Sequence, residues 1–500
     1  MTNTLEKNSS ILKQKVKFFL FRAVTYCFFL LTPIWLPKAI ELPKAIQVPL
    51  MVLYIMFMMT QWYLMGKEID HRLKIYFRVN SSIDRLIYRM SLGMFFMVIL
   101  FNLLSFLPAK WIYNSFWIIW AALGLFYSWP TRGKIINESV SANFTEFRYL
   151  DAFEKTLLAL IVTFFVFSIP ELPALENIEA LKFAYDPLEK ISPYFWNFLT
   201  VNFYPFKNYN SLFKLGWFLH FYLVGLALFL TTFYAFLRYF VSRRLSILGV
   251  FALISSWSVV KILAADPVAG FSTTFSLLWI WTFLWVTKSA TYRSGLFVGL
   301  IAFWGSLLNP AFFFLIVAQA ALLFFIFHDE NTMWYRRQQM RYAAFGFILA
   351  TFVFLMSNES FRSMRPLDLD FFKNLISALN RKAIYSLSLV GFLIIVFKFF
   401  IKNFRPLQSI HFDHERLKLL IISIATLFVY SLFFDANLNE AFSIMWPIAF
   451  LSLIPLEVLF QSISKLRSRR NLIYLIYIII CLLDSHLEGR VKIFLKLFQG

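Results

Sequence analysis

Long apolar segments, each about the length needed to cross a lipid bilayer, follow one another along the whole chain. Hydrophobic residues make up 60% of the sequence, and the mean hydropathy is +0.68. A helix of about 20 apolar residues crosses a hydrocarbon layer of about 30 Å, whereas barrel strands are shorter and alternate in polarity. In lipid the backbone must satisfy its own hydrogen bonds, so continuous segments of this length predict helices. The sequence therefore predicts an all-α fold, a polytopic transmembrane bundle of about 13–15 spans.

The chain is strongly basic, with a formal net charge of +21 and a pI near 9.8. Nucleic-acid binding would be one explanation. However, Lys and Arg stand in short clusters between the apolar segments, the pattern typical of cytoplasmic loops in membrane proteins. We therefore expect membrane lipids as partners and no nucleic acid. Cys27 and Cys481 lie inside apolar segments, so we expect neither a disulfide framework nor a cysteine-based metal site.

The basic clusters also predict an orientation. With the N-terminus in the cytoplasm, the basic loops at 66–87, 129–153 and 461–470 all face the cytoplasm, as the positive-inside bias requires. The chain is then expected in the cytoplasmic (inner) membrane. The predicted helices lie near 17–36, 47–65, 88–107, 111–128, 154–170, 215–239, 246–264, 271–287, 294–308, 311–327, 342–357, 383–401, 417–434, 441–460 and 471–484.

A long acidic segment, residues 171–214, is expected on the opposite face. It has no apolar span of its own and is rich in proline and aromatic residues, a composition that favours short helices lying in the membrane interface. A second external loop is expected at 358–382. The acidic residues of the first loop are Glu171, Glu176, Glu179, Asp186 and Glu189, and a nearby external turn carries Asp266.

Glycine is scarce and phenylalanine is common, with 15 and 64 residues respectively. Transporters that rock or break their helices usually rely on small residues at close helix contacts. The composition therefore favours a rigid scaffold over a carrier. The sequence also has no glycine-rich phosphate loop and no GxSxG, HExxH or CxxC motif.

Residues 154–330 combine four local features. A predicted helix ends at Pro170 and opens into the acidic loop. A later helix ends in a basic cluster that precedes the small-residue-rich helix from Ser246, and the turn at Asp266 follows. Arg293–Phe325 then reads as two aliphatic helices around the polar-Pro turn Asn309-Pro310. This arrangement resembles the GT-C superfamily of membrane glycosyltransferases, which use polyprenyl-phosphate-linked sugars.

The resemblance implies a catalytic carboxylate in the long external loop. The family often has an adjacent acidic pair there, which this chain lacks; the candidates are Glu171, Glu176, Asp186 and Asp266. A carboxylate can take the acceptor proton, and cationic groups stabilise the leaving phosphate. The second external loop offers Arg362, Arg365, Lys373 and Arg381, followed by Lys382. No cofactor is specified, although a carboxylate cluster could bind Mg²⁺ or Mn²⁺.

The expected organisation has three parts: a four-span module at 1–150, a GT-C-like core at 151–330 and a C-terminal bundle at 331–500. The resemblance implies transfer of a sugar from a polyprenyl-phosphate donor to a lipid or envelope glycan outside the cytoplasm. The alternative is a non-catalytic membrane protein, either a carrier or a component of an envelope assembly. A carrier should place charged residues in mid-span, and Lys261 near a helix end is almost the only candidate.

Overall fold

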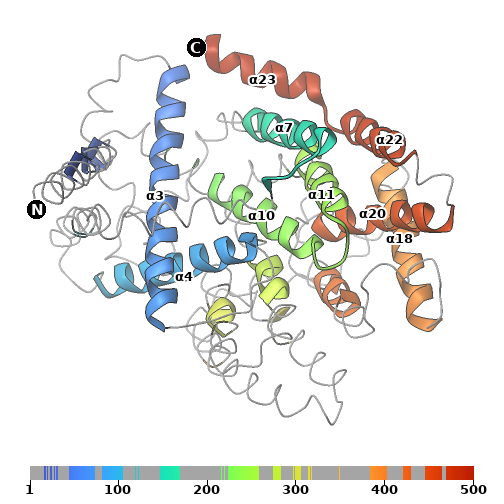
Figure 1. Ribbon diagram of the computed structural model, residues 1–500, viewed down its shortest axis with the longest axis horizontal. Helices are drawn as coiled ribbons and strands as arrows, with labels where there is room; N and C mark the ends of the chain where they lie inside the picture. The colour runs from blue at the N-terminus through green and yellow to red at the C-terminus, as the bar shows by residue number, and fades with distance from the viewer. Residues whose placement is uncertain are drawn as a thin grey trace, which may run out of the picture. The chain divides into compact units, whose positions relative to one another are not determined.

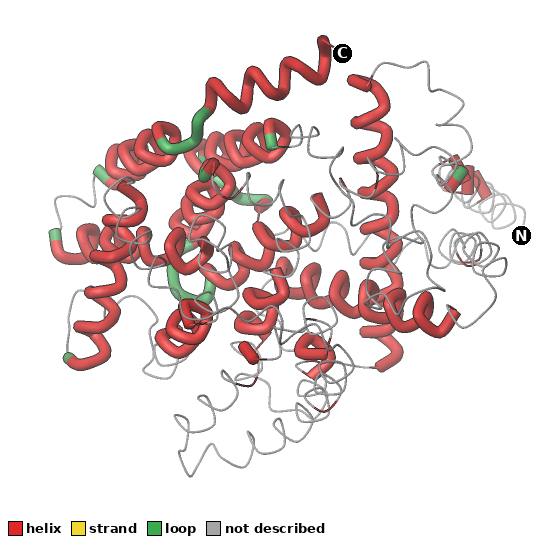
Figure 2. Tube along the Cα trace, turned by 180° about the vertical axis from the view of Figure 1, so that it is seen from behind, coloured by secondary structure: helices red, strands yellow, loops and turns green. Residues whose placement is uncertain are grey.

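The computed structural model describes a set of helical stretches separated by gaps. They cover residues 44–73, 82–104, 147–168, 223–257, 274–282, 383–401, 420–429, 445–463 and 469–499, with isolated positions and short pieces between 16 and 31 and between 119 and 348. Helices make up 91% of the structure, and no strand occurs among the described residues (Figure 2). The prediction of an all-α fold is confirmed for this part of the chain.

The described residues fall into two compact units. Unit 1 contains α3 (Lys44–Leu73) and α4 (Ser82–Leu104), which pack against each other. Both helices are longer on one side than the sequence predicts: α3 continues past 65 and α4 begins before 88, so part of the predicted loop 66–87 is helical. The division of the sequence into three parts at 150 and 330 stays a prediction.

Two glycines bring α3 and α4 into backbone contact. A Cβ atom at Gly66 would overlap the carbonyl oxygen of Arg89, and a Cβ at Gly93 would overlap that of Trp62. Arg89 also bridges the helices through its side chain, donating to Asp70 at 3.1 Å and to the Tyr63 hydroxyl at 3.2 Å. Gly66 and Gly93 thus stand where the backbones of α3 and α4 meet, a small-residue contact that the scarcity of glycine did not lead us to expect.

Unit 2 is built around α11 (Arg243–Ser255), which packs against four other helices (Figure 1). These neighbours are α7 (Ala152–Phe167), α10 (Gly225–Leu237), α20 (Met445–Ser462) and α22 (Arg470–Leu483). The side chains of α11 are buried from Leu245 to Ser255. Two further helices complete the unit: α18 (Ala383–Phe400), which packs on α20, and α23 (Leu487–Gln499).

Aromatic packing fills the space between α10 and α20. The ring of Phe236 lies 4.9 Å from that of Trp446 and 5.7 Å from that of Phe450, both centroid to centroid. Phe240 contacts Phe450 at 5.5 Å, and edge-on geometries of this kind are favourable for aromatic pairs. The abundant phenylalanine therefore supplies the core of unit 2, while Gly391 allows α18 to meet the backbone of α20 at Leu451.

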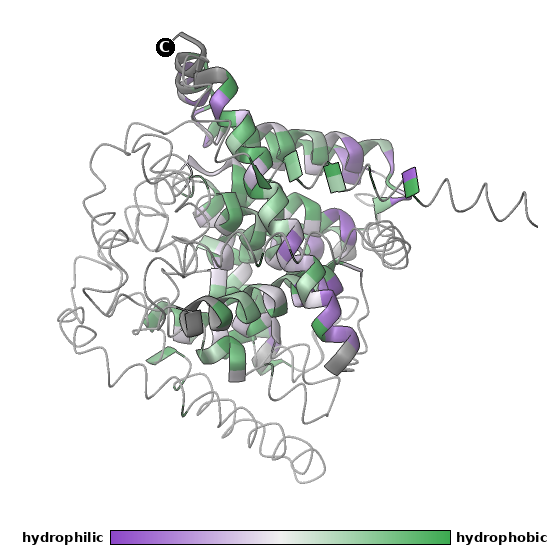
Figure 3. Ribbon diagram, turned by 90° about the vertical axis from the view of Figure 1, so that its left-hand side faces the viewer, coloured by the Kyte–Doolittle hydropathy of each residue, from purple (hydrophilic) through white to green (hydrophobic). Residues whose placement is uncertain are grey.

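The helices consist largely of hydrophobic residues (Figure 3), and some of their large apolar side chains are exposed. On α22 one face is buried through Tyr474, Tyr477, Ile478 and Cys481. The opposite face exposes a stripe at helical spacing, formed by Leu472, Leu475, Ile476, Ile479 and Leu483. On α18 the exposed apolar residues are Leu389, Val390, Phe392, Leu393, Phe397 and Phe400.

Within the described residues, Ile46–His71 of α3 is the single helical stretch whose length and hydropathy suit a membrane crossing, and half of its most apolar window is buried. Further apolar helices are shorter, from 10 to 17 residues. They are Gly225–Leu237, Ala383–Lys398, Leu420–Val429, Met445–Phe460 and Arg470–Leu483.

Candidate functional site

The residues predicted from the sequence to act on substrate lie outside the described residues. This holds for both sets, the external carboxylates and the basic groups for a phosphate, and for the interfacial helices expected in 171–214. They are Glu171, Glu176, Asp186, Asp266, Arg362, Arg365, Lys373 and Arg381. Their roles stay predictions. The described part of unit 2 has two other charged sites, one at each end of α11.

The first begins with the N-terminus of α7. Asp151 is the N-cap, in extended conformation, and its Oδ1 accepts from the backbone N–H of Glu154 at 2.7 Å. In return, Glu154 Oε2 accepts from the backbone N–H of Asp151 at 3.1 Å. This is a capping box, which satisfies two amide groups that have no partner inside the helix. It fixes both carboxylates at one place on the chain.

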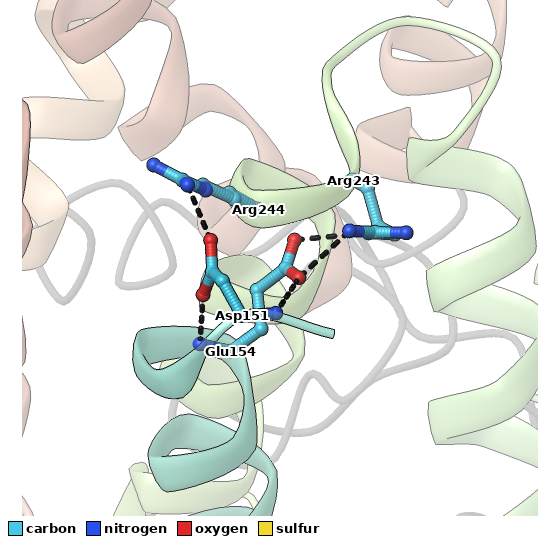
Figure 4. Close-up of polar contacts among 4 residues, drawn as sticks. All are labelled: Asp151, Glu154, Arg243 and Arg244. Carbon is cyan, nitrogen blue, oxygen red and sulfur yellow. Dashed lines mark hydrogen bonds and ion pairs between the residues drawn. The ribbon is translucent and has the colours of Figure 1, made fainter. Parts of the chain in front are cut away.

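Two arginines of α11 meet these carboxylates (Figure 4). Arg243 donates to both oxygens of Glu154, from Nε to Oε1 at 2.9 Å and from Nη2 to Oε2 at 2.8 Å. Arg244 forms an ion pair with Asp151. The Glu154 side chain is only 2% exposed, whereas that of Arg243 is 31% exposed. We call Asp151, Glu154, Arg243 and Arg244 the ion-pair cluster.

The ion-pair cluster resolves an electrostatic conflict between two helices. Arg243 and Arg244 are the first residues of α11, where the helix dipole disfavours positive charge. Asp151 and Glu154 stand at the N-terminus of α7, where the dipole favours negative charge. Because the carboxylates neutralise the guanidinium groups, the two N-termini can lie together. Glu154 already accepts from Arg243 and from a backbone amide, so the cluster suits a structural clamp rather than a general base.

Removing one charge of the cluster should weaken unit 2. We expect Glu154→Gln to lower the free energy of unfolding by about 1–2 kcal/mol, since a charge-assisted bidentate bond is lost while Arg243 keeps partial access to solvent. Thermal and chemical unfolding of the purified protein in detergent micelles would measure this change. The neighbouring exposed Lys155→Gln is the matched control, and equal stability of both variants would show that the clamp contributes nothing.

The second charged site, formed by Arg490, lies at the other end of α11. Arg490 of α23 is 1% exposed and donates to the carbonyl oxygens of Ile254 at 3.1 Å and Ser255 at 2.8 Å. These are the last carbonyls of α11, which ends because Ser256 is extended. The guanidinium also lies over the rings of Phe164 at 5.1 Å and Trp257 at 5.6 Å. Arg490 is therefore a C-terminal cap supplied from a distant helix.

The two ends together define the arrangement of α7 and α11. Their N-termini are joined by the ion-pair cluster, Phe164 contacts Phe251 at 5.7 Å further along, and Arg490 reaches both helices near their C-termini. The helices consequently run side by side in the same direction. The C-cap of α7 is Ser168, so α7 ends at the level that Arg490 contacts, three residues before Glu171 in the sequence.

Sequence reasoning did not identify Arg490, α23 or the partners of Arg243 and Arg244. The local signal for the capping box was present as Asp-x-x-Glu before an apolar segment.

No group of three or more His, Cys, Asp or Glu residues that could hold a metal ion occurs in the described stretches. Comparison of the chain with protein families, with curated proteins and with solved structures gave no match.

Proposed function

We propose that this chain is a polytopic helical protein of the cytoplasmic membrane. The exposed apolar stripe of α22 and the apolar surface of α18 carry this part of the proposal. Fully burying a leucine or isoleucine side chain is worth about 1.5–3 kcal/mol relative to leaving it in water. Several such residues on each helix would be a large unfavourable exposure in water, whereas lipid chains would cover them at no cost.

Membrane integration is tested by extraction of isolated membranes with alkaline carbonate, followed by topology mapping with single cysteines in a Cys27→Ser background. We expect the protein to stay in the pellet, and a cysteine at Asn208 to react with an impermeant reagent from outside the cell. Release by carbonate would overturn the membrane assignment. Protection at Asn208 would overturn the orientation.

Within this class, we propose a GT-C-type glycosyltransferase that moves a sugar from a polyprenyl-phosphate donor to a lipid or envelope glycan on the extracytoplasmic side. The supporting observation is that α7 is clamped at its start and ends at Ser168, directly before the acidic segment. A carboxylate that closely follows a fixed helix in the chain loses less conformational entropy on binding a substrate than one in a freely moving loop. Glu171 would be the base, with Glu176, Asp186 or Asp266 as a second carboxylate.

The enzymatic proposal is tested by sugar transfer from purified polyprenyl-phosphate donors. We expect at least one of Glu171→Gln, Glu176→Gln, Asp186→Asn and Asp266→Asn to lower turnover by about 10²–10⁴-fold, the usual effect of losing a general base. Glu488→Gln is the matched control, because this exposed carboxylate lies on α23 and pairs with Lys492. Parental turnover in all four variants would exclude the assigned base.

The alternative is a non-catalytic membrane protein, a carrier or a component of an envelope assembly. One observation favours it: in the described part of the chain, Glu154 and Arg490, both buried, serve to join helices. The same experiments separate the two proposals. Stable membrane integration without binding of any polyprenyl-phosphate donor would select the non-catalytic alternative.

A further inference from the structure

The C-terminal helix α23 has three distinct faces. Arg490 and Phe494, four residues apart, point toward the rest of unit 2. Leu487, Val491 and Leu495 form a second row at the same spacing, and Leu495 is 50% exposed. Glu488 and Lys492 form a third row, pair with each other at 2.5 Å, and leave 70% of the Lys492 side chain exposed. The apolar row lies between the anchored row and the charged row, with Leu487 and Leu495 exposed and Val491 half-buried.

The anchored row fixes α23 to the ends of two helices. Phe494 packs against Phe167, the last residue of α7, with ring centroids 5.1 Å apart. Arg490 caps α11 and lies over Phe164, as described above. These contacts hold α23 at the level where α7 and α11 end. Rotation of α23 about its axis would break the Arg490 bonds, so the exposure of its apolar row is a fixed feature.

The exposed apolar row continues the stripe of α22. That stripe ends at Leu483, and Leu487 follows after a turn in which His486 has φ 46°. This left-handed residue, unusual outside glycine, redirects the chain immediately before α23 begins. Leu483 and Leu487, both exposed, are thus separated by only three residues, and the charged row of Glu488 and Lys492 flanks the apolar row of α23.

We propose that α23 is an interfacial helix that lies at the boundary between lipid headgroups and acyl chains, where α22 leaves the membrane. The inference rests on the proposed membrane location. The row of Leu487, Val491 and Leu495 enters the acyl boundary, and the row of Glu488 and Lys492 faces headgroups and water. An amphipathic helix in this position sinks its apolar face about 5–10 Å below the surface. The bilayer surface is the partner of this face.

The test is nitroxide labelling of the full chain, in a Cys27→Ser background that keeps the buried Cys481. Labels are placed singly at Ile476 on α22 and at Leu495 and Lys492 on α23. The protein is reconstituted in vesicles of phosphatidylethanolamine and phosphatidylglycerol. Collision rates with oxygen, which enters lipid, and with a water-soluble nickel complex then report depth. Circular dichroism and the unfolding midpoint of each labelled protein confirm that it is folded.

We expect the ratio of oxygen to nickel collisions to be highest at Ile476, intermediate at Leu495 and lowest at Lys492. A ratio at Leu495 equal to that at Lys492 would place α23 in water and overturn the proposal. A ratio equal to that at Ile476 would place it in the acyl core and overturn it as well. Nickel access at Ile476 itself would instead show that α22 does not face lipid, and the proposed membrane location would fail.

Discussion

A single methyl group added at Gly66 is expected to force α3 and α4 apart. The new Cβ would overlap the Arg89 carbonyl oxygen and lie 2.8 Å from the backbone nitrogen of Gly93. Both obstacles are backbone atoms of a helix, so no side-chain rotation can relieve them. Overpacking usually lowers stability by about 1–3 kcal/mol, and we expect Gly66→Ala at the upper end of this range. The Arg89–Asp70 bond across the same helix pair should weaken with it.

The midpoint and the free energy of unfolding of purified Gly66→Ala would measure the effect. Gly489→Ala is the matched control, because among the described residues no atom outside the local backbone of α23 lies within 4 Å of the Cβ position at Gly489. Alanine is the better helix former, so the control should gain about 0.5–1 kcal/mol. If Gly66→Ala unfolds at the parental midpoint, α3 and α4 do not cross at Gly66 and Gly93.

Replacing Arg490 by methionine is expected to release the C-terminus of α11. Methionine keeps a long apolar side chain beside Phe164 and Trp257 but leaves the carbonyls of Ile254 and Ser255 without their donor. Each buried polar group left without a partner costs about 1–3 kcal/mol, so for two carbonyls we expect a total loss of about 2–6 kcal/mol. The effect should exceed that of Glu154→Gln, since the carbonyls left behind belong to buried residues, whereas the side chain of Arg243 is 31% exposed.

Two variants of α23 show whether capping is the cause. Arg490→Lys keeps the charge but replaces the planar fork by a single ammonium group, so it should recover part of the lost stability. Lys492→Met likewise replaces a cation by methionine, but on the exposed face, and should stay within about 0.5 kcal/mol of the parent. Equal stability of Arg490→Met and Lys492→Met would contradict the capping role.

The positions of several helices could be predicted from long apolar segments alone. The predicted segments 154–170, 383–401 and 471–484 differ from α7, α18 and α22 by at most three residues at either end. In these helices the charged residues lie in the first or last turn, so the apolar composition marks both ends. Predictions were less accurate where a helix continues through charged residues, as α3 does at Lys67 and Asp70.

The end of α11 illustrates what local sequence cannot reveal. Residues 246–264 predict one continuous helix, because no glycine or proline falls near Ser256, where the structure shows extended backbone. The interruption is stabilised by Arg490, which lies 235 residues beyond Ser255. The ion-pair cluster depends likewise on Glu154 and Arg243, 89 residues apart. Pairings at such separations leave no pattern in a single sequence. The predicted catalytic carboxylates, which lie outside the described residues, are still predictions.

The distance in sequence between α11 and its cap has a consequence for biosynthesis. A ribosome completes α11 at Ser255, and Arg490 is added as the 235th residue after it. Throughout that interval the carbonyls of Ile254 and Ser255 must be satisfied by water or by a temporary partner. Docking of α23 is therefore the event that completes unit 2, and it comes after synthesis of α18, α20 and α22. A chain interrupted before Arg490 would lack the donor that these two carbonyls have in the finished molecule.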